Sequence, residues 1–260
     1  MPDQPDQPAT RLTRIEHDVA RITWSEDLTA RGWQAAADVV RREVAAALVE
    51  QHRVEAKVRV DDAVGQRVAT WSGLHREGIE RRRDGDLVVY ARLADDVALN
   101  EPGGFRALLN SFLPRKRAIA QMLVRDESGG EPRVLLCRLT YKADWDLPGG
   151  VVEVNESPRL AVGREVTEEL GLTLEPGRLL LTDWLPPWGG WDDAVGLVFD
   201  GGRHPASLID AVVPQEREIR SAAFCTLEEI EERAADFTAR RIRAALAALD
   251  GGATYTESGR

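Results

Sequence analysis

Three glutamates that share one side of a predicted helix are the residues of this sequence best placed to do chemistry. Glu165 and Glu169 are four residues apart and Glu168 is three residues after Glu165, so their side chains are neighbours on a helix surface. Like charges at this spacing repel, and partial burial increases the cost. A divalent cation reverses the sign of this interaction. Oxygen-only ligands select hard cations such as Mg²⁺, so a metal ion at these glutamates would fit phosphoryl chemistry.

The helix that carries these glutamates has clear boundary signals. Ser157 suits the N-cap, Pro158 suits the first helical position, and Gly171 suits the left-handed residue that closes a helix. The sequence therefore predicts a helix over about residues 158–170. An apolar row on its other side would dock it on a sheet: Val162, Val166 and Leu170.

Two glycines just before this helix favour a functional role for the acids. Gly149 and Gly150 permit backbone conformations closed to other residues, so a carbonyl group there can point at a metal ion held by the helix. An ion pair between Glu156 and Arg164 would fix the intervening loop against the helix. The alternative interpretation is that the glutamates form only a solvated acidic helix face, the usual explanation of such a run.

The segment from Gly150 to Leu172 resembles the signature of the Nudix hydrolase family. That signature is Gly, five residues, Glu, seven residues, Arg-Glu, an aliphatic, any residue, Glu-Glu, any residue, Gly and an aliphatic. So many constrained positions at fixed spacing are far more specific than a lone glycine motif. The chain meets every one of them, with Gly150, Glu156, Arg164, Glu165, Val166, Glu168, Glu169, Gly171 and Leu172.

The resemblance implies a fold, a metal site and an activity. The implied fold is α/β, a Nudix-type α/β/α sandwich with a mixed sheet, whose signature forms a loop, helix and loop that binds Mg²⁺ or Mn²⁺. The implied reaction is hydrolysis of a pyrophosphate bond in a nucleoside diphosphate linked to another group. The implied roles are as follows: Glu165 and Glu169 as principal metal ligands, Glu168 as a further ligand or catalytic base, the Gly149 carbonyl as a further ligand, and Gly150, Glu156 and Arg164 as structural residues.

Residues after the signature supply candidates for the base and for the substrate site. In this family the base lies in the signature or on a later loop, where Glu216 and Glu218 are the candidates and a charged loop without a role is the alternative. The loop over 184–191 is rich in tryptophan, and aromatic faces stack on nucleobases. The alternative is that these rings cover the core edge. The candidate substrate-binding residues are Trp184, Pro187, Trp188 and Trp191.

The position of Pro187 bears on the substrate. It follows Leu172 at a distance similar to that of a marker proline in the ADP-ribose pyrophosphatase branch of the family. We therefore expect ADP-ribose or a related nucleotide sugar as the substrate. The alternatives are nucleoside triphosphate clean-up and a non-catalytic, nucleotide-sensing regulator with the same fold.

The chain before the signature domain predicts a smaller α+β module over residues 1–113. An apolar stripe at helical spacing predicts one helix over 28–50, and alternating residues predict a strand over 54–60. Asp84-Gly85 predicts a hairpin within 79–93. Dimerisation, covering of the active site and substrate selection are all open as roles of this module.

The remaining chain is divided at Leu113-Pro114, which ends a short predicted helix. Residues 114–250 hold the signature, several predicted strands and a final amphipathic helix, and form the predicted Nudix hydrolase domain. We expect residues 251–260 to be a flexible tail.

Composition limits the class of protein. Of 260 residues, Asp and Glu outnumber Lys and Arg to give a formal charge of -10, which argues against duplex nucleic acid as a partner but not against a small nucleotide. Only Cys137 and Cys225 occur, both in apolar stretches, so we expect core thiols and a cytoplasmic protein. Residues 1–8 have no features of a secretion signal and are expected to be a flexible lead-in. No run is apolar enough for a membrane span.

Overall fold

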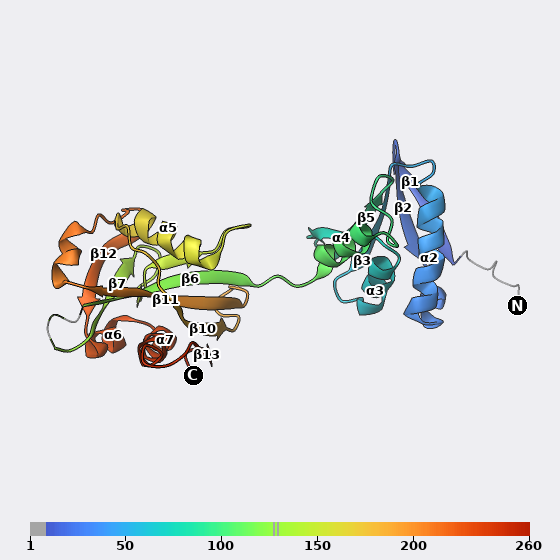
Figure 1. Ribbon diagram of the computed structural model, residues 1–260. Helices are drawn as coiled ribbons and strands as arrows, with labels where there is room; N and C mark the ends of the chain where they lie inside the picture. The colour runs from blue at the N-terminus through green and yellow to red at the C-terminus, as the bar shows by residue number, and fades with distance from the viewer. Residues whose placement is uncertain (1–8, 127, 129) are drawn as a thin grey trace, which may run out of the picture. The chain divides into compact units, whose positions relative to one another are not determined.

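The computed structural model describes residues 9–126, 128 and 130–260, which form two compact units. The N-terminal unit is Met1–Pro114 and the C-terminal unit is Arg115–Arg260 (Figure 1). Each unit has its own buried apolar core. The expected lead-in over residues 1–8 lies outside the described residues. No helix in the described part of the chain is both long and apolar enough to cross a membrane.

The N-terminal unit is a five-stranded sheet with helices, within the residues described. The strand order is β1-β2-β3-β5-β4; β2 and β3 are parallel, and the other pairs are antiparallel. Its elements are β1 (Thr10–Glu16), β2 (Val19–Trp24), α1 (Glu26–Ala30), α2 (Trp33–Ala47), β3 (Arg53–Arg59), α3 (Ala63–Trp71), β4 (His75–Glu80), β5 (Leu87–Leu93) and α4 (Pro102–Phe112).

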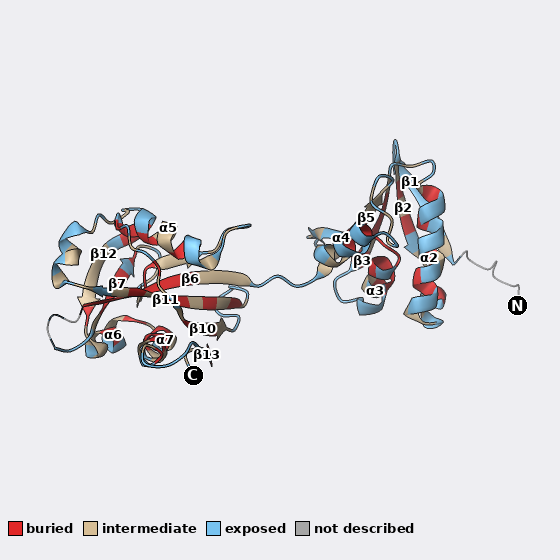
Figure 2. Ribbon diagram, viewed as in Figure 1, coloured by how far each residue is buried: buried red, intermediate tan, exposed pale blue. Residues whose placement is uncertain are grey.

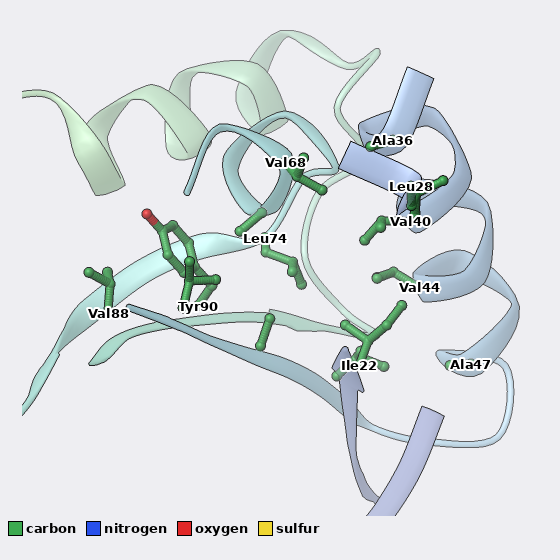
Figure 3. Packing of buried hydrophobic residues seen from close by; sticks show 14 residues of the cluster. Ile22, Leu28, Ala36, Val40, Val44, Ala47, Val68, Leu74, Val88 and Tyr90 are labelled. Carbon is green, nitrogen blue, oxygen red and sulfur yellow. The ribbon is translucent and has the colours of Figure 1, made fainter. Parts of the chain in front are cut away.

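Helices α2 and α3 pack their apolar stripes on this sheet. Val40 and Val44 of α2 and Val68 of α3 are fully buried, and they meet Ile22 and Tyr90 of the strands in one cluster (Figure 3). The strand predicted over 54–60 is β3, and the predicted hairpin is the antiparallel pair β4 and β5. The apolar residues of the sequence, which recur about every two positions in strands and about every 3.6 in helices, therefore predicted elements of this core.

Two features of the N-terminal unit differ from the prediction. The single helix expected over 28–50 is wrong: α1 and α2 are separate helices, because Gly32 between them has φ 102°, which a continuous helix does not allow. The antiparallel hairpin of β1 and β2 was not expected. Most β1 side chains are exposed, so this edge strand has no alternating apolar pattern to reveal it.

The C-terminal unit is built on an eight-stranded mixed sheet, counted over the described residues. The main strand order is β12-β7-β6-β11-β10-β13, with β8 paired to β7 and β9 to β6. The β6–β11 and β10–β13 pairs are parallel. Its elements are β6 (Arg117–Asp126), β7 (Arg133–Leu139), β8 (Trp145–Asp146), β9 (Gly149–Val151), α5 (Pro158–Leu170), β10 (Leu179–Leu185), β11 (Ala194–His204), η1 (Ala206–Ala211), β12 (Ile219–Cys225), α6 (Leu227–Arg233), α7 (Asp236–Ala247) and β13 (Thr254–Glu257).

This unit is the expected α/β/α sandwich, with α5 on one face of the sheet and α6 and α7 on the other (Figure 1). Successive residues of β6 serve the two faces: Met122 packs with α5, and Leu123 packs with α7. Because both faces are covered, β6 and β7 are buried along most of their lengths (Figure 2). Cys137 and Cys225 are buried free thiols, as expected.

Part of the tail expected to be flexible over residues 251–260 is a strand, so that expectation is wrong for residues 254–257. Residues Thr254–Glu257 form β13, which extends the sheet alongside β10. Asp183 of β10, which has no exposed surface, accepts hydrogen bonds from Thr256 Oγ1 at 2.8 Å and from Gly259 N at 2.9 Å. The tail is ordered because it satisfies a buried carboxylate distant in sequence.

Candidate active site

Helix α5 holds the three glutamates and begins and ends where the sequence predicts. Ser157 Oγ accepts a hydrogen bond from Leu160 N at 3.3 Å, and Gly171 closes the helix with φ 68° and ψ 10°. The predicted apolar row of α5 is fully buried against the sheet: Val162, Val166 and Leu170. Glu169 is also buried, next to this row, and its carboxylate meets the glycine turn at Gly149.

The glycine turn passes very close to β6 and to the Glu165 side chain. Gly149 has φ 132°, and a Cβ built there would lie 2.2 Å from the carbonyl oxygen of Ala120 on β6. A Cβ on Gly150 would lie 2.5 Å from Cδ of Glu165. The backbone contact and positive φ therefore require glycine at position 149. The contact at Gly150 shows that the Glu165 carboxylate lies directly against the turn and would be displaced by a Cβ there.

Glu169 is the most buried of the three acids. Its residue is only 5% exposed, and Oε2 accepts a hydrogen bond from Gly149 N at 2.9 Å. Burial raises the pKa of Glu169 to about 8; the Gly149 hydrogen bond opposes the rise and the nearby charge of Glu165 adds to it. In the described part of the chain no cationic side chain pairs with this carboxylate. A cation at this place would offset the cost of its burial.

Glu165 and Glu168 are linked through Arg164. The Arg164 Nη1 atom donates to Glu165 Oε1 and to Glu168 Oε2, both at 3.0 Å. The other side of the guanidinium binds Glu156, with Nε donating to Oε1 at 2.9 Å and Nη2 to Oε2 at 3.0 Å. The ion pair inferred from the sequence is therefore present. It ties the loop before α5 to the helix.

The acids do not form a closed metal cage by themselves. Within the described residues, no three His, Cys, Asp or Glu side chains already lie close enough to enclose a metal ion. The donors present nevertheless fit a hard divalent cation: they are oxygens, Glu165 and Glu169 face the same glycine turn, and Glu169 is buried without a counter-charge. Mg²⁺ typically uses one or two protein carboxylates and takes its other ligands from water and substrate phosphates.

Glu218 lies with this group of acids although it comes from a distant loop. Its charge is close enough to raise the pKa values of Glu165 and Glu169, for both of which burial is the larger cause. The backbone places it: Glu218 O accepts from Thr140 N at 2.8 Å, and Gln215 N donates to Glu169 O at 2.9 Å. The structure thus brings Glu218 near α5. Glu216, the other candidate, is exposed, and among the described residues its charge is not a main influence on the pKa of Glu165 or Glu169, whereas that of Glu218 is.

A cationic pocket of about 420 Å³ opens next to Thr140. Lys142, one of its lining residues, donates to Asp146 Oδ2 at 2.6 Å, and Arg220 Nη2 donates to the Thr140 carbonyl at 3.1 Å. Its lining includes three cations and no acid, so it favours an anionic occupant. The lining residues are Arg138, Thr140, Tyr141, Lys142, Ala143 and Arg220.

The tryptophan loop is exposed and contacts other elements than α5. Trp188 and Trp191 are 68% and 62% exposed. The Trp188 ring lies 6.1 Å from that of Phe237 on α7, and the Arg117 guanidinium lies 4.5 Å above the Trp191 ring. Trp184 is partly buried, with Nε1 donating to Asp193 at 3.3 Å, and Pro187 is exposed. In the described part of the chain, the three tryptophans contact Asp193, Phe237 and Arg117 rather than the glutamates of α5.

A buried polar chain that the sequence did not reveal supports the glycine turn. Arg241 Nη1 of α7 donates to Gln121 Oε1 at 3.0 Å, and Gln121 Nε2 donates to Asp146 Oδ1 at 2.9 Å. Asp146 Oδ1 also accepts from Leu147 N at 2.9 Å, directly before the turn. The available signal was Gln121 itself, a polar residue in an otherwise apolar strand.

Comparisons with known proteins agree with this architecture. The NUDIX domain model matches residues 114–246. A MutT-like protein of Streptomyces ambofaciens is 30% identical over 147 residues, which cover 54% of this chain and 81% of that protein. A Bacillus subtilis protein provisionally named an ADP-ribose pyrophosphatase is 44% identical over 50 residues, covering 19% of this chain and 24% of that one.

Solved structures are also similar to this chain. The MutT protein of Methanosarcina mazei is 26% identical with a TM-score of 0.44, and the match covers 53% of this chain and 97% of that one. The family-model match, the MutT-like relative and the complete signature on α5 lead to one conclusion: this chain belongs to the Nudix family, with the hydrolase domain in its C-terminal unit. It is a Nudix hydrolase acting on pyrophosphate bonds.

Proposed function

We propose that the protein hydrolyses the pyrophosphate bond of a nucleoside diphosphate linked to another group, and that it needs Mg²⁺ or Mn²⁺ to do so. The observation that carries this proposal is the convergence of Glu165 and Glu169 on the glycine turn. Glu165 leaves no room for a Cβ on Gly150, and Glu169 accepts from Gly149 N. Holding two buried carboxylates close together costs electrostatic free energy, and a bound divalent cation offsets that cost.

Glu165, Glu169 and the Gly149 carbonyl would hold the cation, with Glu168 as a further ligand. A bound divalent cation neutralises diphosphate oxygens and lowers the pKa of a bound water. The ion pair between Arg164 and Glu156 holds the loop against the helix. Gly150 has no side chain and so leaves space for the Glu165 carboxylate, and it would not itself be a metal ligand.

Glu218 or Glu168 would accept the proton of the attacking water. Arg164 Nη1 donates to both Glu168 and Glu165. Burial is the main cause of the raised pKa of Glu165, and the charge of Glu218 raises that pKa further. Glu168 is more constrained, because Arg164 holds its carboxylate at 3.0 Å. Since Glu218 has no such ion pair among the described residues, it is the better candidate for the base.

The substrate would place its anionic part near the cationic pocket and its base on exposed aromatic surface. Lys142 and Arg220 line that pocket near Glu218, and Trp188 and Trp191 offer exposed faces for stacking. ADP-ribose or a nucleotide sugar is the proposed substrate. Pro187 and the short match to the relative named for ADP-ribose support it. Nucleoside triphosphates are the alternative within the same chemistry.

A substrate panel tests this proposal. The full chain is incubated with ADP-ribose, a nucleotide sugar or a nucleoside triphosphate, each with Mg²⁺ or with EDTA, and the products are separated by anion-exchange chromatography. We expect Mg²⁺-dependent release of a nucleoside monophosphate from ADP-ribose. Glu218→Gln should lower kcat by about a hundredfold with little change in KM, as loss of a general base does. Glu216→Gln, a matched change two residues away, should keep normal kcat.

Two results would redirect the proposal. Pyrophosphate release from nucleoside triphosphates, with ADP-ribose intact, would assign the clean-up activity instead. Tight nucleotide binding without turnover of any compound would favour the nucleotide-sensing regulator.

A further inference from the structure

A second pocket, in the N-terminal unit, has the chemistry of a ligand site. It encloses about 590 Å³, within the range of roughly 300–1,000 Å³ typical of small-molecule sites. It is lined from several elements of one unit: α3, β4, β5, the end of α4 and the chain just after β3. The lining residues that matter here are Arg67, Thr70, Trp71, Arg76, Tyr90 and Phe112.

Aromatic rings form the apolar part of this pocket. Trp71 is 37% exposed, and its ring meets that of Phe112 edge-on, with centroids 6.4 Å apart and planes at 61°. The Trp33 ring also packs near Trp71, with centroids 6.3 Å apart. The Trp71 ring is therefore held in place by two neighbours while part of its surface stays open. A fixed, partly open aromatic ring can receive a planar group at little entropic cost.

Tyr90 brings a polar group to the same pocket. Its residue is only 2% exposed, and its hydroxyl points away from the aliphatic residues Ile22 and Val44 (Figure 3). Burial raises the pKa of Tyr90, whereas a hydrogen bond with Thr70 and the charge of Arg76 oppose the rise. Thr70, Arg76 and Tyr90 all line this pocket.

Two arginines from different elements give the pocket its charge. Arg67 lies on α3 and Arg76 lies on β4. The backbone N–H of Arg76 donates to Ser111 Oγ of α4 at 3.1 Å. No Asp or Glu lines the pocket, and within the described residues neither guanidinium forms an ion pair. Arginine forks bind phosphate oxygens with matching geometry, and two forks match a group with several anionic oxygens.

We propose that this pocket binds a small molecule that carries both an aromatic ring and a phosphate group, of the size of a nucleoside monophosphate. The ring would lie against Trp71 and Phe112, and the phosphate would bind Arg67 and Arg76. This inference concerns the N-terminal unit alone and does not depend on the proposed hydrolase function. It gives the module a ligand-sensing role that its sequence left open.

Calorimetric titration of the full chain with AMP in EDTA tests the proposal. We expect saturable binding, weakened about tenfold or more by Arg67→Gln and by Arg76→Gln, because each removes a charged hydrogen-bonding partner of the phosphate. Both arginines are exposed, so these changes leave the core intact. Arg81→Gln is the matched control: it removes the same charge from an exposed position of the same unit outside the pocket, and should bind AMP as the parent chain does.

Adenosine and inorganic phosphate separate the two halves of the ligand. Each should bind at least about tenfold more weakly than AMP, because each uses only one part of the pocket. The proposal is overturned if AMP shows no saturable binding at millimolar concentration. It is equally overturned if the Arg67 and Arg76 variants bind AMP like the Arg81 variant, or if adenosine binds as tightly as AMP.

Discussion

Glu169 combines burial with the absence of a cationic partner among the described residues. Its carboxylate is held by one backbone N–H and is surrounded by other acids. A side chain of this kind weakens the fold unless it is protonated or meets a cation. The same feature that supports metal binding therefore has a measurable effect on stability when the metal is removed.

In protein freed of divalent cations, raising the pH should lower the free energy of unfolding. Burial raises the pKa of Glu169 from its ordinary value of 4.5 to about 8. Between these two values the unfolded chain has released this proton and the folded chain still holds it. The contribution of protonated Glu169 to the free energy of unfolding is therefore fully present below pH 4.5 and is lost as the pH rises toward 8.

Urea unfolding in EDTA across that pH range measures this effect. Glu169→Gln should flatten the pH dependence, whereas Glu175→Gln, at an exposed position beyond the helix, should leave it as it is. An unchanged slope in the Glu169 variant would show that the carboxyl is already ionised in the folded chain.

At the scale of elements, α5 and the glycine turn must fit each other closely. Gly150→Ala should abolish most hydrolysis, because its Cβ would lie 2.5 Å from Cδ of Glu165 and would push the carboxylate out of place. Steady-state kinetics should show the loss, with kcat/KM reduced by about a hundredfold, comparable to the disruption of a metal site's supporting residues.

Gly163→Ala on the same helix is the matched control for this substitution. A Cβ there would meet only Pro176, at an ordinary 3.6 Å. Alanine favours a helix interior over glycine by roughly 0.5–1 kcal/mol, so this variant should be slightly more stable and fully active. Equal activity of the two alanine variants would contradict the placement of Glu165 against the turn.

A buried ion pair that the sequence did not predict joins β10 to α7, and its carboxylate also binds the chain of β13. Asp183 accepts from Arg241 Nε at 2.8 Å, and the two side chains are 0% and 3% exposed. Asp183→Ala leaves the Arg241 charge buried without this partner and should cost about 3–5 kcal/mol in the free energy of unfolding. Thermal denaturation with a matched Asp210→Ala control on η1 checks this value. A loss as small as the control's would show that the fold does not depend on this pair.

Local signals predicted α5, and distant partners explain what was missed. Ser157, Pro158 and Gly171 mark the helix ends by their own chemistry. By contrast, β13 is ordered by Asp183, some seventy positions earlier, and the chain from Arg241 through Gln121 to Asp146 joins three separate segments. A single sequence carries no direct sign of such pairings.

The whole molecule consists of two units with separate cores. The family match lies in the second unit, over residues 114–246, and the described acids of the candidate site all belong to that unit. Residues 114–260 alone should therefore fold and keep Mg²⁺-dependent hydrolysis within about tenfold of the full chain. Circular dichroism and the same activity assay measure both properties. An unfolded fragment would show that the N-terminal unit completes the core.

The dependence of hydrolysis on Mg²⁺ concentration tests the central claim most directly. The initial rate is measured over a titration of Mg²⁺ for the parent chain, Glu169→Gln and the Gly163→Ala control. We expect saturation by Mg²⁺ in the parent and control chains, and a loss of at least about a hundredfold in kcat/KM for Glu169→Gln. Turnover that Glu169→Gln leaves undiminished, or that persists in EDTA, would contradict the assignment of these carboxylates to a metal site.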